Sequence, residues 1–257
     1  MANYDILGDV AILKFHDKAG KKEKLAKAQE IISQYKSVKT VLEKTDKVSG
    51  RLRTIKTHFL LGKNTLIAHY VESGCKFNLK VDSCYFSPRL AHERLEIAKM
   101  IKKNSSVLVM FSGVAPFPIV IAKNAKPRKI VSIELGKDCE KYALENIEMN
   151  KVADVVKHIQ GDVKRIIPKL KEKFDVVVMP RPNLKETFLS DALKVSKKNT
   201  SIIYYGFCAE TKLVKMLDDL HKQAKKLRRK IKITDVKEAG DIAPYEHRYR
   251  IEIKVLN

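Results

Sequence analysis

The chain has 257 residues, of which 44% are hydrophobic and 32% are charged, so it can bury a sizeable core, as in one large α/β domain with a small appended one. No apolar run approaches the roughly 20 residues that cross a bilayer, and the N-terminus lacks a signal-peptide pattern, which predicts a cytoplasmic protein without a membrane partner. The net charge of +22 creates a field that attracts polyanions and favours a nucleic acid over a small acidic substrate. Taken one at a time, the lysine runs are more typical of solvated helix faces or loops than of a nucleic-acid site.

The four cysteines show neither C-x-x-C spacing nor a histidine at a zinc-like distance. We therefore expect no metal site. Nothing in the sequence reads as a long exposed apolar stripe, and we expect a monomer.

The first 82 residues predict a small α+β domain that serves RNA or substrate binding. Residues 4–15 read as a strand pair or as one strand with a bulge at Gly8, and residues 21–35 show helical spacing. Short β-type segments follow, punctuated by glycines, at residues 38–43, 51–57, 65–71 and 76–81.

Residues 83–257 predict a second domain in which strands and helices alternate. A helix is expected from Leu90 to Lys102, and the first strand after it spans residues 107–111. Further strands are expected at residues 130–134, 155–159, 175–179, 201–207, 231–237 and 247–255. Helices are expected between them at residues 117–125, 137–149, 163–172, 184–197 and 210–225. This alternation predicts a mostly parallel seven-stranded sheet of the class I methyltransferase (Rossmann-like) type, closed by a hairpin with one antiparallel strand.

Ligands of such sheets bind at the carboxyl ends of the strands. Glu134 ends the second strand, 21 residues after Gly113, where a carboxylate can accept hydrogen bonds from ribose hydroxyls. The same carboxylate geometry serves NAD proteins. The turn at Gly113 lacks the G-x-G-x-x-G pattern, which weighs against a dinucleotide and is compatible with S-adenosylmethionine, a cofactor without a pyrophosphate. Asp162 follows the third strand and can accept from an adenine amino group. The alternative for both Glu134 and Asp162 is an exposed loop carboxylate without a binding role.

A stiff turn, Pro180-Arg181-Pro182-Asn183, follows the fourth strand. It can hold a flat base beside the cofactor, with Arg181 or Asn183 hydrogen-bonded to that base. The alternative is a simple connector between a strand and a helix.

Three segments together resemble one family. They are residues 85–117, with YFSPRL followed by Glu93 and Arg94, the turn Pro180–Asn183, and the segment Ala243–Glu246. These segments are similar to the archaeal and eukaryotic tRNA guanosine-37 N1-methyltransferases. Residues 4–15 and 50–53 resemble the small middle domain of that family, so the resemblance covers nearly the whole chain.

The resemblance implies transfer of a methyl group from S-adenosylmethionine to N1 of the purine beside the anticodon, with the anticodon stem-loop of tRNA as partner. It implies that Glu93 is the general base and that Arg53 supports the reacting base. This is chemically sensible, because N1–H of guanine is a weak acid and its removal requires a desolvated carboxylate or a cation near O6. The remaining residues that we expect to contact the cofactor are Tyr85, Arg94, Phe111, Gly113, Glu134, Leu135, Asp162, Val163 and Pro180. Those expected to contact the substrate base, besides Arg53, are Arg181, Pro182 and Asn183.

Structural explanations also exist for the two catalytic candidates. Glu93 can be a first-turn carboxylate favoured by the helix dipole, and Arg53 a surface strand residue. The chain also departs from the family pattern at three positions. Val109 replaces an aspartate, Ala115 replaces the second glycine of the turn, and Pro180 replaces an asparagine. The resemblance begins at the middle domain, so we expect recognition through the anticodon stem-loop and the basic surface.

Three functions follow from these observations. The leading one is a tRNA (guanine-37-N1)-methyltransferase. The second is the related aminocarboxypropyl transferase of wybutosine synthesis, which uses another carbon on the same sulfonium. The third is a non-catalytic RNA-binding relative.

Overall fold

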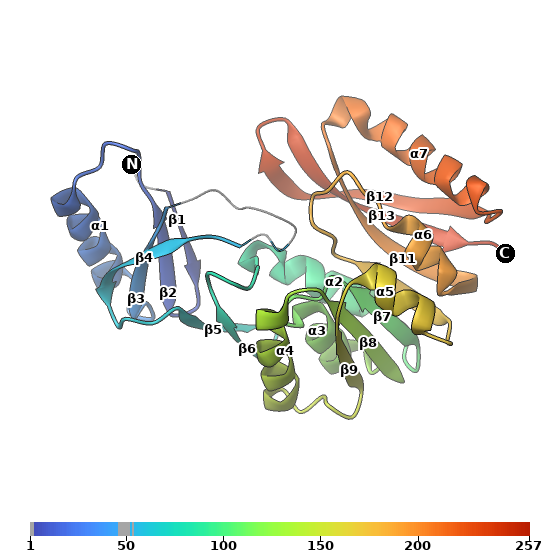
Figure 1. Cartoon of the computed structure of the whole chain (residues 1–257), viewed down its shortest axis with the longest axis horizontal. Coiled ribbons are helices and arrows are strands. Elements are labelled where there is room, and N and C mark those ends of the chain that lie inside the picture. Colours follow the sequence, from blue (N-terminus) through green and yellow to red (C-terminus); the bar gives the residue numbers. More distant parts are fainter. Residues whose placement is uncertain (1–2, 46–51, 53) are drawn as a thin grey trace.

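The computed structural model describes residues 3–45, 52 and 54–257. Within them the chain forms a four-stranded sheet, a two-stranded hairpin and a seven-stranded sheet. Figure 1 shows the four-stranded sheet at one end of the molecule and the seven-stranded sheet at the other.

The N-terminal sheet has the order β1 (Asn3–Leu7), β2 (Val10–Lys14), β3 (Thr40–Lys44) and β4 (Thr57–Gly62). The β1–β2 hairpin confirms the strand pair expected at residues 4–15. Helix α1 (Lys21–Gln34) covers one face of the sheet through buried Ala28 and Ile31. The expected strand at residues 51–57 begins only at Thr57 in the described residues, and its positions 51 and 53 lie outside them.

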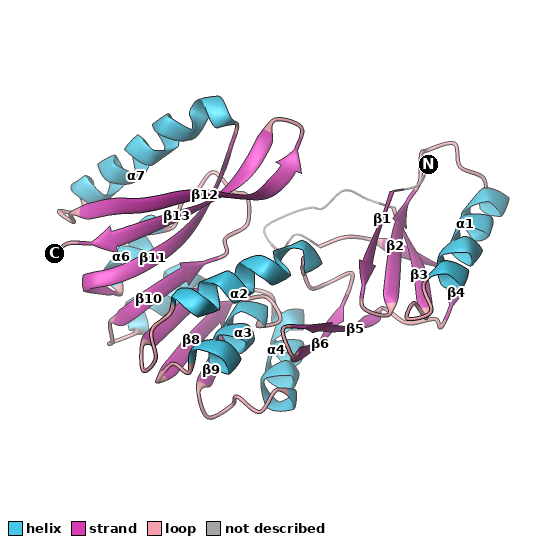
Figure 2. Ribbon diagram, turned by 180° about the vertical axis from the view of Figure 1, so that it is seen from behind, coloured by secondary structure: helices cyan, strands magenta, loops and turns pink. Residues whose placement is uncertain are grey.

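The hairpin of β5 (Ile67–Glu72) and β6 (Cys75–Lys80) lies between the two larger sheets (Figures 1 and 2). Helix α4 (Lys137–Met149) hydrogen-bonds to the backbone of β6 through asparagine side chains. The Asn146 Oδ1 atom accepts from the amide of Asn78 at 2.7 Å, and Asn150 Oδ1 accepts from the amide of Lys76 at 2.9 Å. These bonds satisfy backbone groups on an edge strand and attach the hairpin to the larger domain.

The seven strands of the large sheet follow the order β12 (Ile231–Ala243), β13 (Glu246–Val255), β11 (Ser196–Cys208), β10 (Phe174–Met179), β7 (Ser106–Met110), β8 (Lys129–Glu134) and β9 (Val156–Gln160). Strands β11, β10, β7, β8 and β9 pair in parallel, and β13 is antiparallel to both β11 and β12. The prediction of a mostly parallel seven-stranded sheet with one antiparallel strand is therefore confirmed.

Helices cover both faces of this sheet (Figure 2). On one face, apolar residues of α2 (Ala91–Met100), α3 (Pro116–Ala125) and α4 share a core with the strands. On the other face, α5 (Val163–Ile166), α6 (Leu189–Lys194) and α7 (Leu213–Lys226) do the same. None of the helices in the described residues is long and apolar enough to cross a membrane.

Two expected helices are shorter in the structure. The helix expected at residues 163–172 continues beyond α5 only as a 3-10 turn, Ile167–Lys169, which contains Pro168. The helix expected at residues 184–197 begins at Leu189. The carbonyls of Leu184 and Glu186 accept hydrogen bonds from the Arg181 guanidinium, so the segment before Leu189 is fixed as a loop.

Candidate active site

A pocket lies at the carboxyl ends of β7, β8, β9 and β10, where ligands of open α/β sheets bind. Its empty volume, open solvent included, is about 1130 Å³. Most of the residues predicted from sequence line it, namely Tyr85, Arg94, Phe111, Gly113, Glu134, Leu135, Asp162, Val163, Pro180, Arg181 and Pro182. The structure thus brings together residues from segments nearly 100 positions apart.

The turn after β7 holds three residues with left-handed backbone, Phe111 (φ 59°), Gly113 (φ 55°) and Ala115 (φ 66°). This conformation is disfavoured for residues with a Cβ by roughly 1–2 kcal/mol, so the turn stores strain at the site. Phe111 also packs edge-on against Phe188, with ring centroids 4.9 Å apart. The turn therefore fixes the backbone of Gly113 at the pocket wall.

Glu134 joins this turn to the start of α4. Its Oε2 accepts the amide of Gly113 at 2.7 Å, and its Oε1 accepts the amide of Gly136 at 2.8 Å. Burial raises the pKa of Glu134 above its ordinary value, although the bonds from Gly136 and Gly113 act in the opposite direction. The carboxylate has more lone pairs than these bonds use, so it can also accept a hydroxyl.

Asp162 follows β9 and begins α5, where its Oδ1 accepts the amide of Lys164 at 3.0 Å. This is an N-cap, a structural role that is compatible with a place in the pocket wall.

Arg94 is buried and forms a two-point ion pair with Glu72 of β5. Its Nε and Nη2 atoms donate to the two carboxylate oxygens, each at 2.5 Å, and Nη2 also donates to the carbonyl of Ser87 at 3.1 Å. The guanidinium lies over the rings of Phe86 and Phe117, both of which line the pocket. Sequence reasoning missed Glu72, because no local pattern links it to a helix 22 residues later.

Glu93 is buried but is not among the described residues that line the pocket. Its Oε1 accepts the hydroxyl of Tyr205 at 2.7 Å and Nη1 of Arg250 at 3.0 Å. Tyr205 does line the pocket, together with Phe207 and Arg248. Sequence reasoning missed these last three residues, although Tyr205 and Phe207 lie at the carboxyl end of the next parallel strand, β11, where the same rule applies.

The turn after β10 has a different arrangement from the one expected. Arg181 is buried, and its guanidinium donates to the carbonyls of Tyr205, Leu184 and Glu186, while lying over the ring of Tyr204. Its hydrogen bonds therefore go to backbone within the protein. Asn183 is exposed and does not line the pocket. Arg53 lies outside the described residues.

Val109 stands where the family pattern has an aspartate, and the side chains around it are mostly apolar. Val109 is fully buried in β7, opposite Val178 of β10 and Ser132 of β8, and belongs to the core that includes Ala115 and Phe117. A carboxylate at this position would be desolvated among apolar side chains.

Comparison with known proteins decides the family. The sequence profile described as the TRM5/TYW2 methyltransferase domain matches residues 68–233, and the profile described as the TYW2 N-terminal domain matches residues 1–65. The chain belongs to the TRM5/TYW2 family. It is 33% identical to the tRNA (guanine(37)-N(1))/4-demethylwyosine(37)-methyltransferase Taw22 of Nanoarchaeum equitans, over 99% of this chain and 100% of that protein. It is 31% identical to the tRNA(Phe) (4-demethylwyosine(37)-C(7)) aminocarboxypropyltransferase of Methanocaldococcus jannaschii, over 80% of this chain and 79% of that protein.

Solved structures agree with this TRM5/TYW2 assignment. The crystal structure of Trm5b from Pyrococcus abyssi has 30% identity and a TM-score of 0.88, covering 99% of this chain and 75% of that one. The structure of M. jannaschii TYW2 in complex with AdoMet shares the fold, with 23% identity and a TM-score of 0.75 over 99% of this chain and 100% of that one. The family depends on S-adenosylmethionine.

The residues present fit that cofactor. Gly113 and Gly161 place backbone without a side chain at the pocket wall, and Glu134 supplies acceptors suited to a ribose. Apolar side chains suited to the faces of an adenine ring line the same wall, namely Phe111, Leu135, Val163 and Phe188.

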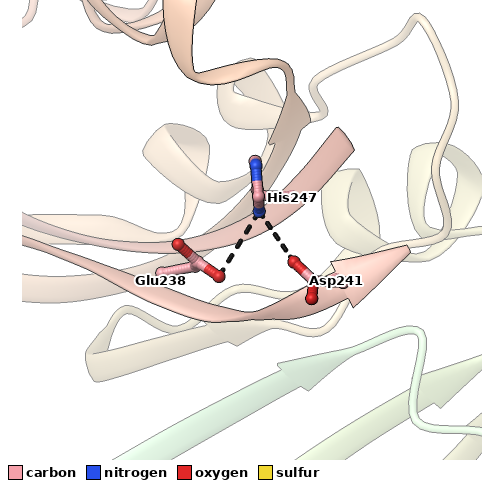
Figure 3. A group of neighbouring side chains, drawn as sticks. All are labelled: Glu238, Asp241 and His247. Carbon is pink, nitrogen blue, oxygen red and sulfur yellow. Dashed lines mark hydrogen bonds and ion pairs between the residues drawn. The ribbon is translucent and has the colours of Figure 1, made fainter. Parts of the chain in front are cut away.

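A histidine and two carboxylates converge on the β12–β13 hairpin, as Figure 3 shows. The Nδ1 atom of His247 lies 2.8 Å from Asp241 Oδ1 and 3.3 Å from Glu238 Oε1. Although desolvation acts in the opposite direction, the hydrogen bond to Asp241 and the charge of Glu238 raise the pKa of His247 above its ordinary value. Such donors can ligate a divalent cation, but an imidazole N–H directed at two carboxylates accounts for the arrangement without one.

Proposed function

We propose that this chain transfers the methyl group of S-adenosylmethionine to N1 of guanosine 37 in tRNA. The observation that carries the proposal is a half-buried carboxylate in the pocket wall together with a buried carboxylate next to that wall. Glu134 lines the pocket, and Glu93 accepts the hydroxyl of pocket-lining Tyr205 and precedes pocket-lining Arg94 in α2. The names of its relatives and the net charge of +22 support tRNA as the substrate.

In this proposal, S-adenosylmethionine when bound supplies an electrophilic carbon on a sulfonium. Glu134 orients the ribose, and Asp162 lies where it can accept from the adenine. The target base leaves its stack and enters the pocket beside Pro180 and Pro182. Glu93 takes up the N1 proton, which gives N1 the lone pair that attacks the methyl carbon. Arg53 supports the base.

A second candidate is transfer of the aminocarboxypropyl group to the same tRNA position. The match of residues 1–65 to the TYW2 N-terminal domain favours it specifically. The segment YFSPRL and the double-proline turn favour methyl transfer. The two reactions use different carbons on one sulfonium, so the way in which the methionine part is held decides between them.

A double-label assay distinguishes these activities. The protein is incubated with unmodified tRNA and with S-adenosylmethionine labelled either on the methyl group or on the aminocarboxypropyl chain. We expect methyl label on N1 of guanosine 37. The same assay is run on tRNA that carries a wyosine-type precursor base. Transfer of the aminocarboxypropyl label alone, on either tRNA, would contradict methyl transfer and support aminocarboxypropyl transfer. Tight tRNA binding without transfer of either label would leave a non-catalytic RNA-binding protein and would refute both enzyme proposals.

Two controls sharpen this assay. A Glu93→Gln variant should bind S-adenosylmethionine as the wild type does and lose methyl transfer. Affinity for tRNA should fall steeply as salt rises, because basic residues displace counterions from the phosphates. A Glu93→Gln variant with full transfer activity would remove Glu93 from the mechanism.

A further inference from the structure

The side chain of Tyr205 connects Glu93 with the pocket. Tyr205 lies in β11 and lines the pocket, whereas Glu93, in the first turn of α2, is absent from the wall formed by the described residues. The Tyr205 hydroxyl donates to Glu93 Oε1 at 2.7 Å. The ring of Tyr205 packs on Phe117 of the pocket wall, with centroids 6.2 Å apart, which limits its movement.

Glu93 lies in a network of charged side chains from α2, β12 and β13. Arg250 of β13 donates to it at 3.0 Å and also to Glu96 at 2.9 Å, and Lys237 of β12 also pairs with Glu96. Arg250 further pairs with Glu252 at 3.3 Å. The next cation along α2, Arg94, is directed at Glu72 instead. Glu93 thus accepts hydrogen bonds from Arg250 and Tyr205.

The phenol keeps its own proton in the resting protein. Burial, followed by the charge of Glu93, raises the pKa of Tyr205 well above its ordinary value. A phenol that donates its proton retains lone pairs that can accept another. Tyr205 therefore has the two properties of a proton relay, because its hydroxyl donates to Glu93 and the same oxygen has lone pairs that can accept a proton.

We propose that Tyr205 relays the substrate N1 proton to Glu93. This rests on the proposed methyl transfer. The N1–H bond breaks as a new O–H bond forms on the Tyr205 oxygen, while the original Tyr205 O–H bond breaks and its proton forms an O–H bond with Glu93. The N1 lone pair forms the bond to the methyl carbon, and the bond from that carbon to sulfur breaks with its electron pair left on sulfur. Tyr205 ends as it began, and Glu93 ends protonated.

The test is single-turnover methyl transfer to unmodified tRNA by wild type, Tyr205→Phe, Glu93→Gln and the double variant. General acid–base groups contribute about 10²–10⁴ in rate. We expect Tyr205→Phe to lower the rate by about 10²–10³ with unchanged affinity for S-adenosylmethionine, and the double variant to be no slower than the slower single one. The lost rate should recover as the pH rises toward the range in which the base loses its N1 proton unaided. A purely structural role would show no such recovery.

The matched control is Tyr204→Phe. Tyr204 is the preceding residue of β11 and is equally buried, but it belongs to the core on the opposite face of the sheet. The Tyr204→Phe variant should keep the wild-type rate of methyl transfer. If Tyr205→Phe does not fold, 3-fluorotyrosine at position 205 keeps the size and the hydrogen bond. Its more acidic phenol should then shift the pH–rate profile.

The outcomes separate the two proposals. An active wild type with an equally active Tyr205→Phe overturns the relay alone and indicates that Glu93 contacts the base directly. A loss of rate that alkaline pH does not reverse, or that Tyr204→Phe shares, also overturns it, as does a fluorotyrosine variant with an unshifted profile. A wild type that transfers no methyl label overturns the proposed function and the relay with it.

Discussion

The ion pair between Glu72 and Arg94 should be a main determinant of stability at the junction between the β5–β6 hairpin and α2. Both side chains are almost fully buried, with 3% and 2% exposed, and the two charge-assisted bonds are each 2.5 Å long. The change Glu72→Gln keeps the volume but leaves one oxygen acceptor and turns an NH₂ group toward the guanidinium. One bond is lost and the other becomes a bond to a neutral group.

The expected magnitude follows from these contacts. A hydrogen bond to a charged group contributes about 1.5–3 kcal/mol, and removal of one partner of a buried pair costs about 3–5 kcal/mol. We expect Glu72→Gln to lower the free energy of unfolding by about 3 kcal/mol. The measurement is equilibrium urea unfolding of the wild type and the variant at neutral pH, with the free energy taken from midpoint and slope.

The paired variant Glu72→Met with Arg94→Met tests the reasoning. Replacing a whole buried ion pair by apolar residues of similar volume is often neutral or stabilising, so the double variant should unfold close to the wild type. A loss below about 1 kcal/mol for Glu72→Gln would refute the argument. So would a double variant less stable than Glu72→Gln.

Three further predictions concern other described residues. The hydrogen bond from Lys237, and then that from Arg250, lower the pKa of Glu96 to about 2, so its stabilising effect is present above pH ~4.3 and is lost as the pH falls toward 2. Glu96→Gln should therefore flatten the dependence of unfolding free energy on pH in that window, and a curve parallel to that of wild type would contradict this. In Glu134→Gln one side-chain oxygen remains to accept the amides of Gly113 and Gly136. The variant should weaken S-adenosylmethionine binding by about 1–3 kcal/mol, or roughly 5- to 150-fold in Kd measured by calorimetry. An unchanged Kd would exclude a role of Glu134 in cofactor binding. Arg181→Lys leaves carbonyls of the loop at residues 184–186 without donors and should increase proteolytic cleavage there, whereas wild-type resistance would show that the guanidinium does not hold the loop.

The sequence alone predicted many of the residues that line the pocket. Glu134 ends one strand, and Gly113 and Asp162 each follow another, so a local pattern and the rule of carboxyl strand ends predicted that they lie together. The same local pattern misplaced the helix at residues 184–197, because the fold of that segment depends on where the Arg181 guanidinium points.

The amino-acid sequence by itself therefore determined the order of strands and helices along the chain, the parallel sheet and the edge at which the pocket residues gather. These features follow from the spacing of apolar residues and from turn residues, which act over a few neighbouring positions. The tertiary structure decided which charged groups meet. Glu93 finds Tyr205 112 positions away and Arg250 157 positions away, on strands that the sheet order brings beside the start of α2. Such pairings depend on sheet order and on the rotation of each helix against the sheet, and no local pattern in the sequence encodes either.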